Sequence, residues 1–141
     1  MYPEELLQPM RNEVASLGIK EVKTAAAVDE EIKNSTGTVF VFVNSVCGCS
    51  AGSARPALKL ALNQPIRPDK LLTVFAGQDV EATIQARKYF TGFPPSSPSM
   101  WLLRDGKVVH AVERRQIEGR PPQMIADHLI ETFKEYCEVA A

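Results

Sequence analysis

Cysteine is scarce in this sequence, because only three of its 141 residues are cysteines. So few cysteines, in an odd number, exclude a scaffold of structural disulfides. No apolar run approaches the roughly 20 residues that cross a bilayer, and residues 1–5 lack the basic-then-apolar pattern of a signal peptide. The net charge of −1 offers no electrostatic attraction for nucleic acid or an anionic membrane. We therefore expect a soluble, cytoplasmic protein that binds neither nucleic acid nor membranes.

The chain is long enough to bury one good hydrophobic core. Its 141 residues are a single-domain length, and 45% of them are hydrophobic. The sequence contains no internal repeat, low-complexity tract or linker. It therefore predicts one domain over residues 1–141.

The most informative segment lies between a strand and a helix. Residues 39–43 are an unbroken run of β-branched and aromatic residues, typical of a strand covered on both faces. Residues 51–62 have the alanine and leucine content of a helix packed closely on a sheet. Pro56 within that helix predicts a kink or a fresh start.

Two cysteines lie between these elements. Asn44 and Ser45 predict a turn at the end of the strand, and Cys47, Gly48 and Cys49 follow directly. Catalytic groups gather at the carboxyl edge of an α/β sheet, so this thiol pair is placed for chemistry.

Hydrophobic periodicity predicts the remaining elements. Helices are expected over 4–17, 24–33, 80–89 and from 119 onward, and strands over 19–23, 70–76, 99–103 and 107–112. Pro9 predicts a short turn and a fresh start in the first helix. Thr24 and Asp79 are expected to be N-caps, and Asp105-Gly106 predicts a β-hairpin. The expected apolar face of the last helix is Met124, Ile125, Leu129, Phe133 and Tyr136.

This order of elements resembles the thioredoxin fold. In that fold a proline-bearing loop before the first hairpin strand faces the active cysteines, and Pro98 takes that place here. The resemblance implies an α/β domain with a central mixed β-sheet flanked by helices and with an extra N-terminal helix. The sequence leaves open whether the peptide bond before Pro98 is cis.

Several motifs together resemble the bacilliredoxin family over nearly the whole chain. They are Asn44-Ser45-Val46-Cys47-Gly48-Cys49, Gly52 with Ala54-Arg55-Pro56, Pro94-Pro95-Ser96-Ser97-Pro98-Ser99-Met100 and Ile117-Glu118-Gly119. The resemblance implies thiol–disulfide exchange, in particular removal of bacillithiol from S-bacillithiolated client proteins, with weak disulfide isomerase activity. It implies Cys47 as the attacking thiol and Cys49 as its partner. It also implies bacillithiol as co-substrate and no bound cofactor.

The residue types suit that chemistry. Exchange is attack by a thiolate, and a helix N-terminus lowers the ordinary cysteine pKa of about 8.5. Cys47 precedes the helix and is expected to be more accessible than Cys49. A Cys-x-Cys disulfide closes a ring one residue smaller than that of Cys-x-x-Cys, so we expect a strained and oxidising couple.

Supporting roles are expected for four further residues. Gly48 would relax part of the ring strain. Arg55 is more often a surface or helix-capping residue, but it lies close enough to hold a thiolate or a substrate carboxylate. Ser97 and Pro98 would receive the backbone of a client protein.

Two other functions fit parts of the same segment. A Cys-x-Cys pair is found in metal carriers, but two sulfurs do not complete a tetrahedral zinc site, and Cys137 lies at the far end of the chain. Such a site would need a second chain, and we assign no metal. Residues 49–55 fit the Cys-x5-Arg loop of cysteine phosphatases, although Pro56 replaces the expected hydroxyl residue.

The other chemically interesting side chains are expected to have ordinary roles. Cys137 is assigned as a packing or bystander thiol rather than a resolving one. His110 and His128 have no partner nearby in sequence, which favours structural roles. Residues 113–115 are expected to be a solvated strand end.

Overall fold

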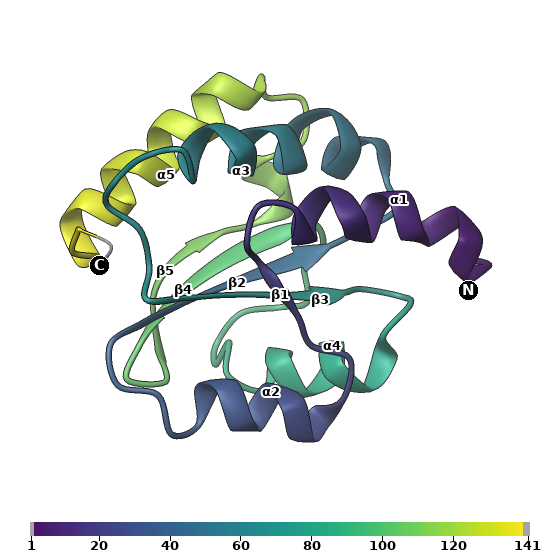
Figure 1. Cartoon of the computed structure of the whole chain (residues 1–141), viewed down its shortest axis with the longest axis horizontal. Helices are drawn as coiled ribbons and strands as arrows, with labels where there is room; N and C mark the ends of the chain where they lie inside the picture. Colours follow the sequence, from purple (N-terminus) through teal and green to yellow (C-terminus); the bar gives the residue numbers. More distant parts are fainter. Residues whose placement is uncertain (1, 140–141) are drawn as a thin grey trace.

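The computed structural model describes residues 2–139 and has a five-stranded sheet at its centre (Figure 1). The strand order is β1-β3-β2-β4-β5; β1, β3 and β2 run parallel, and β4 runs antiparallel to both of its neighbours. The strands are β1 (Lys20–Glu21), β2 (Thr38–Asn44), β3 (Lys70–Phe75), β4 (Ser99–Arg104) and β5 (Lys107–Val112). The helices are α1 (Glu4–Ala15), α2 (Ala25–Ile32), α3 (Arg55–Ala61), α4 (Val80–Arg87) and α5 (Pro122–Tyr136), with short turns η1 (Ser50–Ala54) and η2 (Arg114–Gln116). The predicted mixed sheet flanked by helices, with an additional N-terminal helix, is confirmed.

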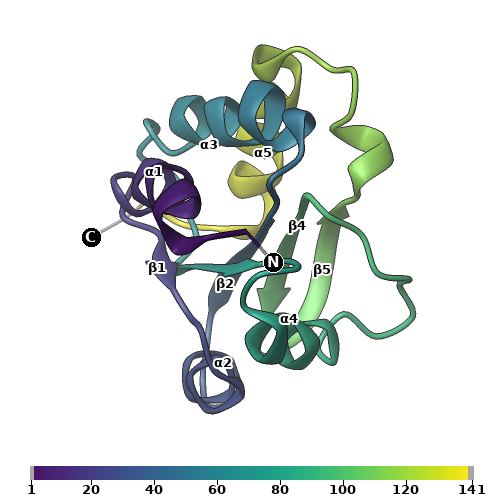
Figure 2. The ribbon, with the colours of Figure 1, turned by 90° about the vertical axis from the view of Figure 1, so that its right-hand side faces the viewer.

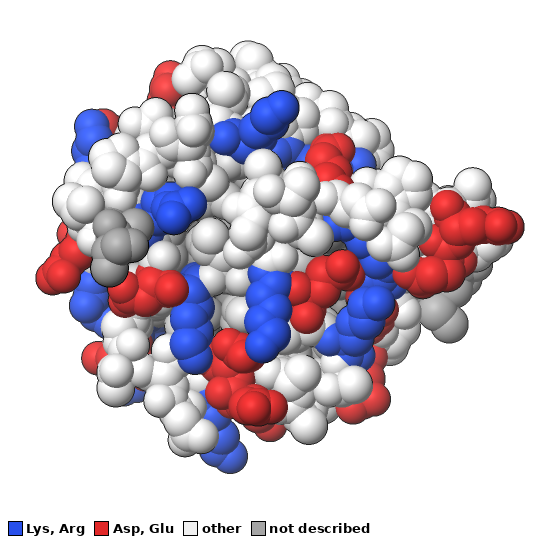
Figure 3. All heavy atoms as spheres, viewed as in Figure 1, with Lys and Arg blue, Asp and Glu red and all other residues white. Residues whose placement is uncertain are grey.

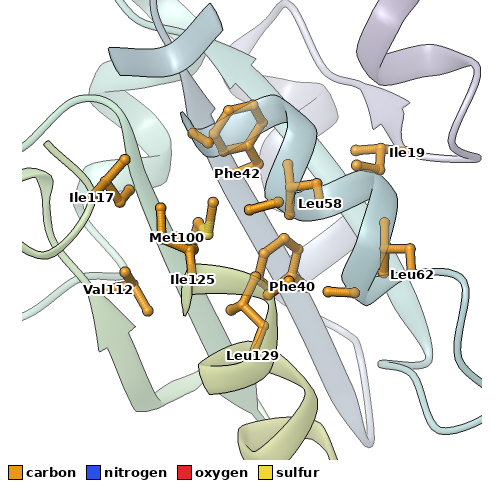
Figure 4. Packing of buried hydrophobic residues seen from close by; sticks show 14 of the residues in the cluster. Ile19, Phe40, Phe42, Leu58, Leu62, Met100, Val112, Ile117, Ile125 and Leu129 are labelled. Atoms are coloured by element: carbon orange, nitrogen blue, oxygen red, sulfur yellow. The ribbon is translucent and has the colours of Figure 1, made fainter. Parts of the chain in front are cut away.

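Helices cover both faces of the sheet. Figures 1 and 2 show α1, α3 and α5 on one face and α2 and α4 on the other. The middle strand β2 is buried at every position, as its unbroken apolar run predicts. Because strand side chains alternate, Phe40 and Phe42 point into the cluster under α3 and α5, while Val41 points into the cluster under α2 and α4. Figure 4 shows Phe40 and Phe42 packed with Leu58 and Leu129.

Several local predictions are confirmed. Asp105 and Gly106 form the turn between β4 and β5 with φ angles of 51° and 80°, the left-handed conformation that a two-residue hairpin turn requires. The Thr24 hydroxyl caps α2 by accepting a hydrogen bond from the Ala27 N–H at 3.1 Å. In α5 the predicted apolar face is correct at Ile125, Leu129 and Phe133 but not at Met124, which is 51% exposed.

Helix α1 runs continuously from Glu4 to Ala15, so the fresh start expected at Pro9 is wrong. Pro9 is exposed, as is Glu5, whose carbonyl loses its helical partner at this proline. That carbonyl can be hydrated on the outer side of the helix, which reduces the cost of the missing N–H.

Arg11 ties α1 to the sheet edge although its side chain is only 3% exposed. Its guanidinium donates to the Asp79 carboxylate at 2.7 and 3.0 Å and also pairs with Glu21 at 3.0 Å and Glu4 at 2.6 Å. It lies 5.1 Å from the centre of the Phe75 ring. Asp79 occupies the N-cap position of α4, as predicted, but its side chain makes no cap bond, because its carboxylate is bound to Arg11.

Charges are interspersed over the face drawn in Figure 3, where Lys and Arg side chains alternate with Asp and Glu. None of the helices within residues 2–139 combines the length and the apolar content needed to span a bilayer.

Candidate active site

The cysteine segment begins where β2 ends. Asn44 is the last residue of β2, and Cys47 stands immediately before a helical turn that starts at Gly48. The Cys47 carbonyl accepts hydrogen bonds from the N–H groups of Ser50 at 3.1 Å and Ala51 at 3.3 Å. The first of the paired thiols therefore lies at a helix N-terminus, as the sequence predicts, where the helix dipole favours a negative charge.

The helix that follows is not α-helical at first. Residues Ser50–Ala54 form a π-helical turn, in which the Arg55 N–H bonds to the Ser50 carbonyl five residues back. The α-helix proper starts at Arg55 and carries Pro56 in its first turn, where a proline's missing N–H costs little. The interruption predicted at Pro56 is thus present as a change of helix type just before it.

Arg55 is buried beneath the cysteine segment, at 4% exposure, rather than on the surface. Its Nη1 donates to Asn44 Oδ1 at 3.0 Å, to the Ser45 carbonyl at 3.1 Å and to Ser50 Oγ at 3.2 Å. Its Nε pairs with Glu13 on α1 at 3.1 Å. Arg55 therefore fixes both ends of the segment that carries the thiols, and its recorded polar contacts are with the chain itself.

Asn44 is the second centre of this network. Its Oδ1 accepts from the Ser45 N–H at 2.9 Å, from the Ser50 hydroxyl at 2.9 Å and from Arg55. The Ser45 hydroxyl in turn accepts from the Cys47 N–H at 3.2 Å. Sequence reasoning treated Asn44 and Ser45 only as turn residues, and no local signal identifies the buried network that they form.

The two thiols differ in acidity. Burial alone would raise the pKa of Cys47, but hydrogen bonds from the Cys49 thiol, the Ser45 hydroxyl and the backbone N–H groups of Ser50 and Cys49 outweigh it and lower that pKa. Burial raises the pKa of Cys49, and so does its hydrogen bond to Cys47. A single proton held on Cys49 thus stabilises a Cys47 thiolate, which is the nucleophilic form of cysteine.

Both members of this pair, Cys47 and Cys49, are partly exposed, and the greater accessibility expected for Cys47 stays a prediction. Gly48 between them is exposed, and a Cβ added there meets no atom within 4 Å. The dithiol form therefore does not require glycine at this position. The role expected for Gly48, relaxing strain in a Cys47–Cys49 disulfide, remains a prediction about the oxidised form.

The proline loop lies at the same edge of the sheet as the thiols. Ser99, at the start of β4, pairs with Val43 near the end of β2, and the Ser97–Pro98 peptide bond just before it is cis. The Ser99 hydroxyl donates to the Ser96 carbonyl at 2.8 Å and accepts from the Trp101 indole at 2.7 Å. These bonds hold the loop in place beside the cysteine segment.

Arg114 is a site residue that sequence reasoning missed, because residues 113–115 were expected to be a solvated strand end. It begins η2, and its backbone N–H donates to the Ser96 hydroxyl at 2.8 Å. Its Nη1 donates to the Ser97 carbonyl at 3.3 Å and its Nε to the Glu118 carboxylate at 3.0 Å. The contacts with Ser96 and Ser97 join residues 18 and 17 positions apart, so no local pattern predicts that Arg114 lies at the proline loop.

Cys137 lies at the other end of β2 from the thiol pair. It follows α5 and lies beside Thr38, the first residue of β2. The seven-residue strand β2 is about 20 Å long at about 3.3 Å per residue, so Cys137 is out of reach of Cys47 within one chain. Burial raises the pKa of Cys137, which keeps it protonated.

His110 and His128 contact each other, although neither has a partner nearby in sequence. Their Nε2 atoms are 2.8 Å apart, across β5 and α5. Burial lowers the pKa of His110, and the charge of His128 lowers it further.

Neither alternative function gains support from the geometry. Within residues 2–139 no three His, Cys, Asp or Glu side chains converge as metal ligands would. In the Cys-x5-Arg segment, the N–H groups of Ser50 and Ala51 already bond to the Cys47 carbonyl, and the Arg55 guanidinium binds the chain itself. These groups do not form an open cradle for a phosphate.

Thioredoxins are among the solved structures that have a similar fold. Thioredoxin f from spinach chloroplast matches with a TM-score of 0.57 and 20% identity, covering 89% of this chain and 93% of that one. Oxidised thioredoxin from Plasmodium falciparum matches with a TM-score of 0.58 and 15% identity, covering 85% and 99%. The predicted thioredoxin-like fold is thereby confirmed.

Sequence comparison identifies the family. The family described as disulphide isomerase matches residues 2–137. A bacilliredoxin of Koribacter versatilis is 50% identical over 141 residues, covering 100% of this chain and 97% of that protein. A bacilliredoxin of Geobacillus kaustophilus is 49% identical over 137 residues, covering 96% and 94%. The chain therefore belongs to this disulphide isomerase family, together with the bacilliredoxins.

Proposed function

We propose that this protein is a thiol–disulfide oxidoreductase that removes a small thiol, bacillithiol, from S-thiolated client proteins. The observation that carries the proposal is the thiol pair at the helix N-terminus. There the pKa of Cys47 is lowered by four hydrogen-bonding groups while the pKa of Cys49 is raised. The similarity to bacilliredoxins supports both the chemistry and the choice of small thiol.

In the first step the Cys47 thiolate attacks the small-thiol sulfur of the mixed disulfide. A bond forms between that sulfur and the Cys47 sulfur, and the client cysteine leaves with the electron pair as a thiolate. The client backbone lies along Ser97 and Pro98 at the edge of the cysteine segment. No bound cofactor takes part.

In the second step the Cys49 thiol loses its proton and attacks the Cys47 sulfur. A Cys47–Cys49 disulfide forms, and the small thiol leaves as a thiolate. One further small thiol opens this disulfide by forming a mixed disulfide, and a second displaces the first as a small-molecule disulfide, which restores both protein thiols. The same attack by Cys47 on a non-native protein disulfide gives a weak isomerase activity.

A redox titration of the purified protein tests this proposal. Alkylation and mass spectrometry would follow each cysteine separately across defined ratios of reduced to oxidised small thiol. We expect a two-electron transition that links Cys47 to Cys49 and leaves Cys137 unchanged. If only a mixed disulfide on Cys47 accumulates, the second step as written is wrong. If all three thiols stay reduced at every ratio, the oxidoreductase proposal fails.

The pH dependence of alkylation gives a sharper prediction for the reduced protein. A lower pKa means more thiolate at a given pH, so Cys47 should react with iodoacetamide at a lower pH than Cys49 or Cys137. In Cys49→Ser the apparent pKa of Cys47 should rise relative to wild type, because the hydrogen bond from the Cys49 thiol is lost. In Cys47→Ser the apparent pKa of Cys49 should fall, because the neighbouring negative charge is gone. A Cys47 that titrates above Cys137 contradicts the assignment.

A further inference from the structure

Residues 113–120 lie beside the thiol pair and are hydrogen-bonded both to the proline loop and to the turn that follows the cysteines. At one end the Arg114 N–H binds the Ser96 hydroxyl of the proline loop at 2.8 Å. At the other end the Arg120 carbonyl accepts from the hydroxyl of Ser53 in the turn after the cysteines, also at 2.8 Å. Ile117 between them is fully buried in the core. These contacts hold residues 113–120 in a fixed position beside the thiols.

The Arg114 guanidinium extends from residues 113–120 into solvent. Its side chain is 46% exposed, and that of its partner Glu118 is 60% exposed. An arginine has five N–H donors, and the hydrogen bonds to Glu118 and to the Ser97 carbonyl use only two of them. Nη2 makes no hydrogen bond with any residue in the described part of the chain. The guanidinium can therefore still bind a carboxylate through two parallel hydrogen bonds.

The charges of the same two side chains shift the pKa of the Cys49 thiol in opposite directions. The Arg114 charge lowers the pKa of Cys49, and the Glu118 charge raises it, beneath the larger effect of burial. The thiols therefore react close to the charges of an exposed ion pair. An incoming charged molecule can replace one member of that pair.

We propose that Arg114 is a specificity-determining residue, which favours small thiols that carry a carboxylate, and that Glu118 competes with that carboxylate for the guanidinium. The inference rests on the proposed function and names its substrate class. When a small thiolate opens the Cys47–Cys49 disulfide, a bond forms between the small-thiol sulfur and the Cys47 sulfur, and the bond between the Cys47 and Cys49 sulfurs breaks. The electron pair leaves with Cys49 as a thiolate. A carboxylate held by Arg114 positions the attacking molecule for this step.

The test uses the full-length chain with Cys49→Ser and Cys137→Ser, carrying a 2-pyridyl disulfide on Cys47. Release of thiopyridone is followed with three attacking thiols: anionic 3-mercaptopropionate, neutral 2-mercaptoethanol and cationic cysteamine. Arg114→Gln and Glu118→Gln are then made in this background. Dividing each variant's rate by the parent rate for the same thiol cancels the intrinsic nucleophilicity of that thiol.

For Arg114→Gln we expect the rate with the anionic thiol to fall about two- to fivefold relative to the neutral one at low ionic strength, with the cationic thiol changed in the opposite direction. Glu118→Gln should raise the rate with the anionic thiol relative to the neutral one. Arg114→Lys should restore part of the preference for the anionic thiol that Arg114→Gln loses. Added salt should weaken this preference in the parent protein. An equal change for all three thiols in both variants shows a merely structural role and overturns the inference. If the parent releases thiopyridone no faster than a pyridyl-disulfide peptide, with any thiol, the proposed function itself fails.

Discussion

Cys47→Ser is expected to abolish removal of a small thiol from a client protein, down to the uncatalysed rate. A serine hydroxyl is not ionised at neutral pH and cannot form the mixed disulfide through which the first step passes. Cys49→Ser keeps the attacking thiol and should still free the client, but the small thiol then remains on Cys47. The two variants therefore differ in which species accumulates.

Mass spectrometry of a thiolated client and of the enzyme checks this prediction. Cys49→Ser should gain the mass of the small thiol on Cys47, and Cys47→Ser should gain none. Cys137→Ser is the matched control and should behave like wild type, because Cys137 lies at the opposite end of β2. A Cys47→Ser protein with full activity reverses the roles of the pair, and full activity in the Cys47→Ser/Cys49→Ser double variant excludes this chemistry.

Arg55→Met is expected to lower the free energy of unfolding by about 3 kcal/mol, because a buried cation that satisfies several acceptors is removed. The Ser45 carbonyl loses a donor, and Asn44 Oδ1 loses one of three. The segment between Asn44 and Ser50 should then lose its fixed position, so we expect slower thiol exchange as well.

Urea unfolding measures this loss, and about 3 kcal/mol corresponds to a midpoint lower by roughly 1–2 M. Glu13→Gln is the matched control, because it removes only the charge that pairs with Arg55. The Glu13 side chain is 45% exposed, so this change should lower the free energy of unfolding by less than about 1 kcal/mol. Arg55→Lys keeps the charge but not the planar guanidinium. Its free energy of unfolding should therefore lie between those of Arg55→Met and Glu13→Gln. An Arg55→Met protein as stable as Glu13→Gln would falsify the structural role of the guanidinium.

The elements that the sequence predicts correctly are those set by neighbouring residues. The run at 39–43 fixes β2, Asp105-Gly106 fixes the hairpin, and the Thr24 hydroxyl reaches a donor three residues along. The cysteine pair follows from its position after β2. In each case the interaction that decides the structure lies within a few residues of the signal.

The failures involve side chains whose partners are far away in sequence. Asp79 has the residue type of an N-cap, but Arg11, 68 positions earlier, binds its carboxylate. Arg55 finds Glu13 at a separation of 42 positions, and Arg114 finds Ser96 at 18. A long polar side chain reaches partners that only the tertiary fold brings near, so its role is not encoded in local spacing.

The π-helical turn at Ser50–Ala54 also determines the direction in which the thiols face. A π-turn contains one residue more than an α-turn, and each residue of an α-helix adds about 100° of rotation about the axis. Deleting one residue within this turn would restore an uninterrupted α-helix and swing Cys47 and Cys49 about a quarter-turn away from Pro98. The length of the chain between the cysteines and Pro56 is therefore under the same geometric constraint as the cysteines themselves.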